Sequence, residues 1–365
     1  MASALARRHP ATPPPRRAIR LMIVDDSMVA RAVLSRMVEF GGGIEIAAVA
    51  GTAEDAVEAL GYVAVDVILL DLEMPGAGGL SKLPEIIVAA RGARVLVVSS
   101  IAEDGGAAAL AALAQGAADT LLKPGTGRFQ GRFADILMAK IRALGPTGSD
   151  APTSLPPGRA APLQAMGSEP LSLLAIGAST GGIHALGRFF AELPARIGVP
   201  VLVTQHLPVP FMDVFARQLA TAAKRPARIA TDGAPLLADE LLIAPGDAHL
   251  TVDRGRCGSL RVRLTHGRVT SGCLPSVDPM LASISRLALP GAVAVILSGM
   301  GRDGTEGAAE LVRSGGSVLV QDEATSAVWG MPRAIADAGL AAAILPPEKL
   351  ARRVASRIGQ LHADQ

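Results

Sequence analysis

Aromatic side chains are scarce in this chain: they make up 2% of its 365 residues, whereas glycine alone occurs 40 times. So few aromatic rings argue against an aromatic-lined binding groove, and abundant glycine and alanine favour helices packed closely on a parallel sheet. The two cysteines, Cys257 and Cys273, lack the C-x-x-C spacing of zinc and redox motifs. We expect both to be free thiols in a reducing compartment.

Charge of one sign is not in excess, because the formal net charge at pH 7 is +2. This balance, and the lack of a basic helix-turn-helix pattern, argue against a nucleic-acid partner. Long apolar runs are also missing: the stretch 292–297 has the length of a strand, far short of the roughly 20 residues that cross a bilayer. We therefore expect a soluble, cytoplasmic protein that does not insert into a membrane.

The chain length suits two domains of ordinary size. Residues 1–19 are basic, proline-rich and without acids, which favours a disordered tail over a transit peptide. Residues 145–169 are rich in proline and glycine, which is typical of a linker. We therefore expect an N-terminal domain at 20–144 and a C-terminal domain at 170–365.

Both domains have an α/β pattern. In the N-terminal domain, five short apolar segments each precede a helical pattern, at 20–24, 44–50, 66–70, 94–98 and 118–122. This alternation predicts a five-stranded parallel sheet. The C-terminal domain predicts a doubly wound, mostly parallel sheet, with antiparallel hairpins near 240–265 and an amphipathic helix at 347–361.

Polar residues follow several strands of the first predicted sheet: Asp25 and Asp26 after strand one, Asp71 after strand three, Ser99 at the end of strand four and Lys123 after strand five. The carboxyl ends of neighbouring parallel strands meet at one crevice, so these groups should lie close together. An oxygen-only cluster suits Mg²⁺, and a lysine beside it would balance the charge of a phosphoryl group. The alternative is that the acids cap the following helices.

Four segments of this domain resemble the receiver domain of bacterial two-component response regulators: V-D-D-S at 24–27, L-D-L-E-M-P at 70–75, V-V-S-S at 97–100 and L-K-P at 122–124. The resemblance implies a flavodoxin-like fold, with Asp71 as the phosphoryl acceptor. It implies Mg²⁺ held by Asp25, Asp26, Asp71 and the Glu73 carbonyl, and switch roles for Ser99 and Lys123. Thr120 stands where receivers usually carry an aromatic switch residue, so the relay of the signal should differ here.

In the C-terminal domain, the segment G-A-S-T-G-G at 177–182 places Ser179 at a tight turn between an apolar strand at 171–176 and a helix at 183–193. A serine there can be a nucleophile or, with Thr180, a helix cap. A dinucleotide phosphate loop would need glycine in place of Ser179 and an acid at the end of the next strand. That strand ends in T-Q-H at 204–206, which favours a nucleophile.

A serine nucleophile needs a base whose pKa lies near neutrality and an acid that orients the base. His206 ends the strand predicted to neighbour that of Ser179, and Asp303 follows the strand at 292–297 in a glycine-rich turn. Asp303 can equally be the N-cap of the next helix. The order Ser, His, Asp differs from the Ser, Asp, His order of α/β-hydrolases.

Six segments together resemble the catalytic domain of the chemotaxis protein-glutamate methylesterase family (CheB). They are G-A-S-T-G-G at 177–182, T-Q-H-L-P at 204–208, A-P-G-D-A-H-L at 244–250, P-S-V-D at 275–278, L-S-G-M-G-R-D-G at 297–304 and Q-D-E-A…G-M-P at 321–332. The resemblance implies the triad Ser179, His206 and Asp303, and oxyanion donors in the backbone N–H groups near Thr180 and Met300. Trp329 stands where the family carries a smaller aromatic side chain.

The resemblance also implies partners: glutamyl methyl esters on the cytoplasmic helices of chemoreceptors as substrate, glutamine amides as a second substrate, and a chemotaxis histidine kinase as phosphoryl donor. No cofactor is implied for the hydrolysis. A function of another class stays open, a scaffold in which the receiver regulates a non-catalytic protein-binding domain and Ser179 is only a turn residue.

Overall fold

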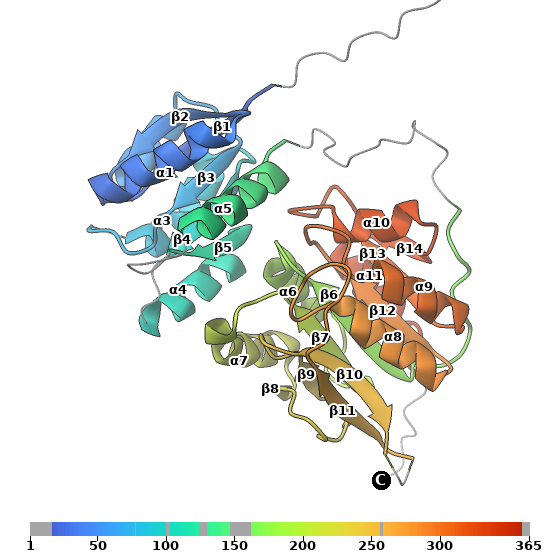
Figure 1. The fold of residues 1–365 in the computed structure, drawn as a ribbon. Coiled ribbons are helices and arrows are strands. Elements are labelled where there is room, and N and C mark those ends of the chain that lie inside the picture. The colour runs from blue at the N-terminus through green and yellow to red at the C-terminus, as the bar shows by residue number, and fades with distance from the viewer. Residues whose placement is uncertain are drawn as a thin grey trace, which may run out of the picture.

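The computed structural model describes residues 17–76, 78–99, 103–123, 130–146, 162–255 and 258–359. Most of the predicted tail, the linker segment 147–161 and Cys257 lie outside these described residues. The described part of the chain forms two α/β domains, which Figure 1 shows side by side. None of the described helices has both the length and the apolar character that crossing a membrane requires.

The N-terminal domain has a five-stranded parallel sheet in the order β2-β1-β3-β4-β5. Its elements are β1 (Ile19–Val24), α1 (Met28–Gly41), β2 (Ile44–Ala50), α2 (Ala53–Leu60), β3 (Val67–Leu70), α3 (Gly78–Ala89), β4 (Arg94–Ser99), α4 (Glu103–Ala114), β5 (Asp119–Leu122) and α5 (Gln130–Leu144). All five predicted strands are confirmed. Helices cover both faces of the sheet, and strands that are buried on both faces consist mostly of apolar residues, which is why the apolar runs predicted them.

The strand order of this sheet decides where its polar residues meet. The order reverses between β1 and β3, and the loops after these two strands therefore diverge above one crevice. Ser27 caps α1, the helix that follows β1, and its hydroxyl accepts a hydrogen bond from the Ala30 N–H. Asp25 and Asp26, the acids after β1, therefore do not have the capping role that was their alternative.

The C-terminal domain has a seven-stranded parallel sheet in the order β14-β13-β12-β6-β7-β9-β8, and a separate antiparallel pair β10-β11. Its strands are β6 (Leu173–Ala178), β7 (Val201–Gln205), β8 (Ala227–Ile229), β9 (Leu241–Ile243), β10 (His249–Arg254), β11 (Leu260–Thr265), β12 (Ala292–Ile296), β13 (Ser317–Gln321) and β14 (Ala343–Leu345). Its helices are α6 (Gly182–Glu192), η1 (Val209–Phe211), α7 (Met212–Ala223), α8 (Val277–Leu287), α9 (Thr305–Arg313), α10 (Met331–Asp337) and α11 (Pro347–Ala355).

The doubly wound sheet and the hairpin are confirmed, with two differences in extent. Residues 241–243 belong to the main sheet as β9, so the hairpin is limited to β10 and β11. The last helix ends at Ala355, because the carbonyl of Arg357 accepts a hydrogen bond from the Leu171 N–H (2.6 Å) at the start of this domain. The described end of the linker also lies on this domain, where the Gln164 N–H donates to the Ala341 carbonyl (2.9 Å).

The two domains touch through β5 and α4 of the first. Helix α4 packs on α6 and α7 of the second domain, and the Gly181 N–H donates to the Ala118 carbonyl (2.6 Å). Val328 of the second domain belongs to the same buried cluster as Leu121 and Leu137 of the first. The N-terminal domain therefore contacts the turn that carries Ser179.

Candidate active site and phosphoacceptor site

Ser179 lies directly after the central strand β6, in the tight turn that leads into α6. Gly181 has a φ of +76°, a conformation that suits glycine, and it is the N-cap of α6 without any side-chain capping bond. The cap interpretation of Ser179 and Thr180 is therefore wrong. Gln205, at the end of β7, donates from Nε2 to the Ser179 carbonyl (2.9 Å) and braces the turn.

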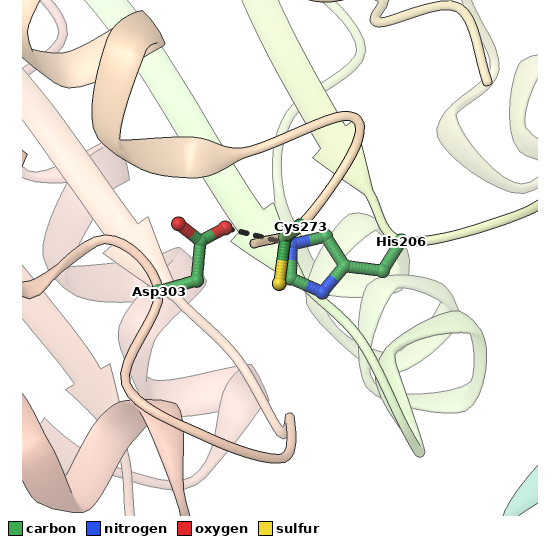
Figure 2. Close-up of side chains that lie close together, drawn as sticks. All are labelled: His206, Cys273 and Asp303. Carbon is green, nitrogen blue, oxygen red and sulfur yellow. Dashed lines mark hydrogen bonds and ion pairs between the residues drawn. The ribbon is translucent and has the colours of Figure 1, made fainter. Parts of the chain in front are cut away.

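His206 and Asp303 meet at the carboxyl ends of β7 and β12, the two strands on either side of β6. His206 Nε2 lies 2.7 Å from Asp303 Oδ2, and Figure 2 shows this hydrogen bond. The bond puts the Nε2 proton toward the acid and leaves Nδ1 as the nitrogen available to a serine. Within the described residues, the Ser179 hydroxyl has no hydrogen bond to His206, as is common before substrate binds.

Asp303 is almost completely buried, with 1% of its surface exposed. Its carboxylate accepts hydrogen bonds from Ser276 Oγ (2.6 Å), Ser271 Oγ (3.0 Å) and the Val277 N–H (2.7 Å) in addition to His206. Burial alone would raise the pKa of Asp303, but the bonds from His206 and Ser276 and the charge of His206 hold it well below its usual range. Helix α9 begins after Gly304 without a side-chain cap, so Asp303 is not its N-cap.

Ser276 and Val277 were not predicted as site residues. Their signal was present in the P-S-V-D motif, but nothing in the sequence connects this segment to Asp303, 27 positions away from Ser276. A second unpredicted neighbour is Cys273, whose side chain lies beside the imidazole of His206 (Figure 2). Burial by itself lowers the pKa of His206, but hydrogen bonds and negative charge from Asp303 and Cys273 raise it to about 9.

The predicted oxyanion donors come from two segments, Thr180 from the turn between β6 and α6 and Met300 from the loop after β12. Within the described part of the chain, neither the Thr180 N–H nor the Met300 N–H donates to a protein acceptor. The loop after β12 passes close to the serine, because a Cβ placed on Gly299 would lie 2.9 Å from the Ser179 Cβ. The Thr180 hydroxyl is occupied by the N-terminal domain, where it donates to the Asp119 carboxylate.

The predicted phosphoacceptor residues also meet. Asp25 and Asp71 are buried, Asp26 is exposed, and one oxygen of each carboxylate lies within 4.8 Å of the others. Lys123 Nζ donates to Asp71 Oδ2 (2.6 Å) and lies 2.7 Å from Asp25 Oδ2. The donor set consists of oxygen atoms alone, which fits a hard cation such as Mg²⁺.

The electrostatics of this site follow from burial and from Lys123. Burial raises the pKa of Asp71, and the hydrogen bond and charge of Lys123 offset only part of that rise. Burial lowers the pKa of Lys123, but its hydrogen bonds to Asp25 and Asp71 outweigh this and leave the pKa raised. The ammonium group is therefore held in its charged form next to the acceptor.

The predicted switch positions are both buried: Ser99 is the last residue of β4, and Thr120 is the second residue of β5. The hydroxyl of each lacks a hydrogen-bond partner among the described residues. Thr120 directly follows Asp119, the residue that accepts the hydrogen bond from Thr180. The position of the missing aromatic switch is therefore adjacent to the domain contact.

Glu73 donates its backbone N–H to Asp71 Oδ1 (3.2 Å), on the side of Asp71 away from Lys123.

Comparison with known proteins finds a match for each of the two domains. Residues 174–354 match the CheB methylesterase family model, and residues 21–129 match the response regulator receiver domain. A protein-glutamate methylesterase/protein-glutamine glutaminase 2 of Caulobacter vibrioides is 40% identical over 343 residues, which cover 93% of this chain and 99% of that protein. A protein-glutamate methylesterase/protein-glutamine glutaminase of Azospirillum brasilense is 37% identical, with 93% of each chain covered.

Among solved structures, the catalytic domain of a Thermotoga maritima CheB methylesterase covers 51% of this chain and 98% of its own, at 32% identity and a TM-score of 0.49. Both relatives align over 93% of this chain, and the receiver match precedes the methylesterase match. The chain therefore belongs to the CheB methylesterase family and carries a response-regulator receiver domain ahead of its catalytic domain.

Proposed function

We propose that Ser179, His206 and Asp303 form the catalytic triad of this enzyme. As a CheB family member, the chain is a protein-glutamate methylesterase/protein-glutamine glutaminase that acts in chemotaxis adaptation. The observation that carries the triad is the His206–Asp303 hydrogen bond of 2.7 Å, formed at strand ends on either side of the Ser179 turn. This arrangement supports general-base catalysis rather than a scaffold role for Ser179.

In the proposed reaction, His206 Nδ1 removes the proton of the Ser179 hydroxyl as its oxygen attacks the ester carbonyl of a glutamyl methyl ester. The unpaired Thr180 and Met300 N–H groups stabilise the negative oxygen that develops. His206 then gives its proton to the departing methoxide, so methanol leaves and an acyl-serine forms. Water, activated by the same histidine, releases the glutamate side chain. With a glutamine amide, the leaving group is ammonia.

Asp303 keeps the imidazole in the required orientation and stabilises its charged form. The hydrogen bonds from Ser271, Ser276 and Val277 compensate for the burial of its carboxylate. A desolvated, fully hydrogen-bonded acid is the arrangement that a triad requires.

Asp71 is proposed as the phosphoryl acceptor, with Lys123 and the Ser99 hydroxyl as partners of the bound phosphoryl group. Asp25, Asp26, Asp71 and the Glu73 carbonyl would hold Mg²⁺, which neutralises charge as the phosphoryl group approaches. The proposed phosphoryl donor is a chemotaxis histidine kinase. The proposed substrates are chemoreceptors methylated on their cytoplasmic helices, which places the enzyme in the cytoplasm.

For the domains, we propose a tail at 1–19, the receiver at 20–144, a linker at 145–169 and the methylesterase domain at 170–365. The family matches at 21–129 and 174–354 support the proposed extents of the receiver and methylesterase domains.

The triad is tested by incubating the full chain with a methylated chemoreceptor and measuring released methanol. Ser179→Ala should abolish release while the circular dichroism spectrum is kept, because the change removes one oxygen and no core volume. His206→Gln should behave in the same way. The exposed Ser259→Ala is a matched control and should keep full activity. More than roughly a tenth of wild-type activity in Ser179→Ala would remove Ser179 as the nucleophile.

A further inference from the structure

The proposed mechanism does not use Cys273, although its thiol lies against the proposed base. The sulfur of Cys273, a ring nitrogen of His206 and a carboxylate oxygen of Asp303 all lie within 4.8 Å of one another. Figure 2 shows the three side chains converging from three separate loops. Asp303 is buried, but His206 and Cys273 are partly exposed, so a small solute can reach the cluster from solvent.

The three ligand types are those of zinc. Zn²⁺ prefers imidazole nitrogen, thiolate sulfur and carboxylate oxygen in tetrahedral geometry, and three protein ligands leave the fourth position to water. Zinc–ligand bonds of about 2.0 to 2.3 Å place neighbouring ligand atoms about 3.3 to 3.6 Å apart. His206 Nε2 and Asp303 Oδ2, now 2.7 Å apart, would therefore move slightly apart on binding zinc. The Cys273 sulfur lies within 4.8 Å of both side chains, so a small rotation of its side chain would bring it to bonding distance of the ion.

The other cluster of acidic side chains, in the N-terminal domain, offers a different set of ligand atoms. Asp25, Asp26 and Asp71 offer carboxylate oxygens alone and suit a hard cation. The cluster at the triad adds sulfur and nitrogen, which favour a softer metal. The two sites should therefore separate Mg²⁺ from Zn²⁺ within one chain.

We propose that His206, Cys273 and Asp303 form an inhibitory Zn²⁺ site within the hydrolase centre. The ion takes Nε2 of His206, the Cys273 thiolate and an Asp303 oxygen. Starting from the imidazolium and the thiol, the Nε2 proton and the thiol proton both leave to solvent, and Nδ1 keeps its proton. Nδ1 can therefore no longer accept the proton of Ser179. Inhibition rests on the proposed triad, whereas binding of the metal does not.

Binding is tested with the full chain in excess Mg²⁺, which keeps the acidic cluster occupied, using Co²⁺ as a spectroscopic probe and Zn²⁺ as its competitor. Wild type and Cys257→Ser should both show thiolate-to-cobalt charge-transfer absorption that Zn²⁺ removes. Cys273→Ser, which keeps the volume of the side chain, should lack the band. Its Zn²⁺ affinity by calorimetry should be at least about tenfold weaker, since even the loss of an indirect contact costs this much. An absent band in wild type, or an equal band in Cys273→Ser, overturns the proposal.

Inhibition is tested by methanol release, with each variant compared with its own metal-free rate. Zn²⁺ should inhibit wild type and Cys257→Ser, and a chelator should restore the rate. The concentration for half-inhibition of Cys273→Ser should rise at least about tenfold. Equal inhibition of all three proteins would place the metal elsewhere and overturn the proposal. Ser179→Ala separates the two hypotheses: it should keep the cobalt band, and unexpected activity in it would refute the triad but leave the metal site standing.

Discussion

Thr180, the residue after the proposed nucleophile, donates its hydroxyl hydrogen to the carboxylate of Asp119 in the receiver domain. The same carboxylate is paired with Lys140 of α5. The next residue of the turn, Gly181, is held by the Ala118 carbonyl (2.6 Å). The start of β5, directly before the switch position Thr120, therefore holds the turn that carries Ser179.

Asp119→Ala should raise the methanol release of the unphosphorylated chain. A hydrogen bond to a charged group contributes about 1.5–3 kcal/mol, so the expected gain is about ten- to hundredfold. The rate should also respond less to a phosphoryl donor, because part of the restraint is already lost. The exposed Asp135→Ala on α5 is the control and should leave both rates unchanged. An unchanged or lower basal rate in Asp119→Ala would show that the contact does not restrain the enzyme.

Removal of residues 1–161 should give an enzyme that is faster than the unphosphorylated full chain and indifferent to phosphoryl donors. This boundary keeps Gln164, which is bonded to the catalytic domain. Moving a closed-to-open ratio from 99:1 to 1:99 takes about 5.5 kcal/mol, more than one phosphoryl group is expected to supply. The phosphorylated full chain should therefore stay slower than the truncated enzyme. A truncated enzyme no faster than the unphosphorylated chain would mean that the receiver assists substrate docking instead of masking the site.

Asp303→Asn should reduce kcat by about 10³- to 10⁴-fold and leave measurable activity. The amide removes the negative charge that stabilises the imidazolium and no longer fixes the tautomer, but a misoriented histidine still acts some of the time. The exposed Asp213→Asn on α7 is the control. Steady-state kinetics on a methylated receptor provides the measurement, and wild-type activity in Asp303→Asn would remove this residue from the triad.

The pH profile should reflect the raised pKa of His206, about 9, which follows from Asp303 and Cys273 despite burial. The base acts only when neutral, so kcat/KM should rise with pH through this value. Cys273→Ser removes a hydrogen bond and a charge that favour the imidazolium, and should move the rising limb to lower pH. Assays need a chelator to exclude metal effects. A wild-type limb centred near 6.5 would contradict this prediction.

Asp71→Asn should take up no phosphoryl label from a small-molecule donor or a histidine kinase, and wild type should lose labelling when a chelator removes divalent ions. The acceptor carboxylate cannot approach an anionic phosphoryl group without charge neutralisation. Asp55→Asn, an exposed acid on α2, is the control and should be labelled normally. Undiminished labelling of Asp71→Asn would identify another acceptor.

Local patterns in the sequence were sufficient to predict the strands, the acids that follow β1 and β3, and the place of Ser179 at a strand-to-helix turn. Each of these depends on residues that are close along the chain: apolar strand runs, polar residues where the runs end, and glycines that permit a sharp turn. The two cap alternatives show the limit of such patterns, because a Ser or Asp before a helix has the same local signature whether it caps or catalyses.

Tertiary structure decided what these residues do. Asp303 is recognised as the partner of His206 only when β6 inserts between β7 and β12, and the two residues are 97 positions apart. The Asp119–Thr180 contact joins residues 61 positions apart in different domains, and Cys273 reaches His206 through an irregular loop. No hydrophobic period or spacing encodes such contacts, because they arise from how packed elements and loops are placed relative to one another.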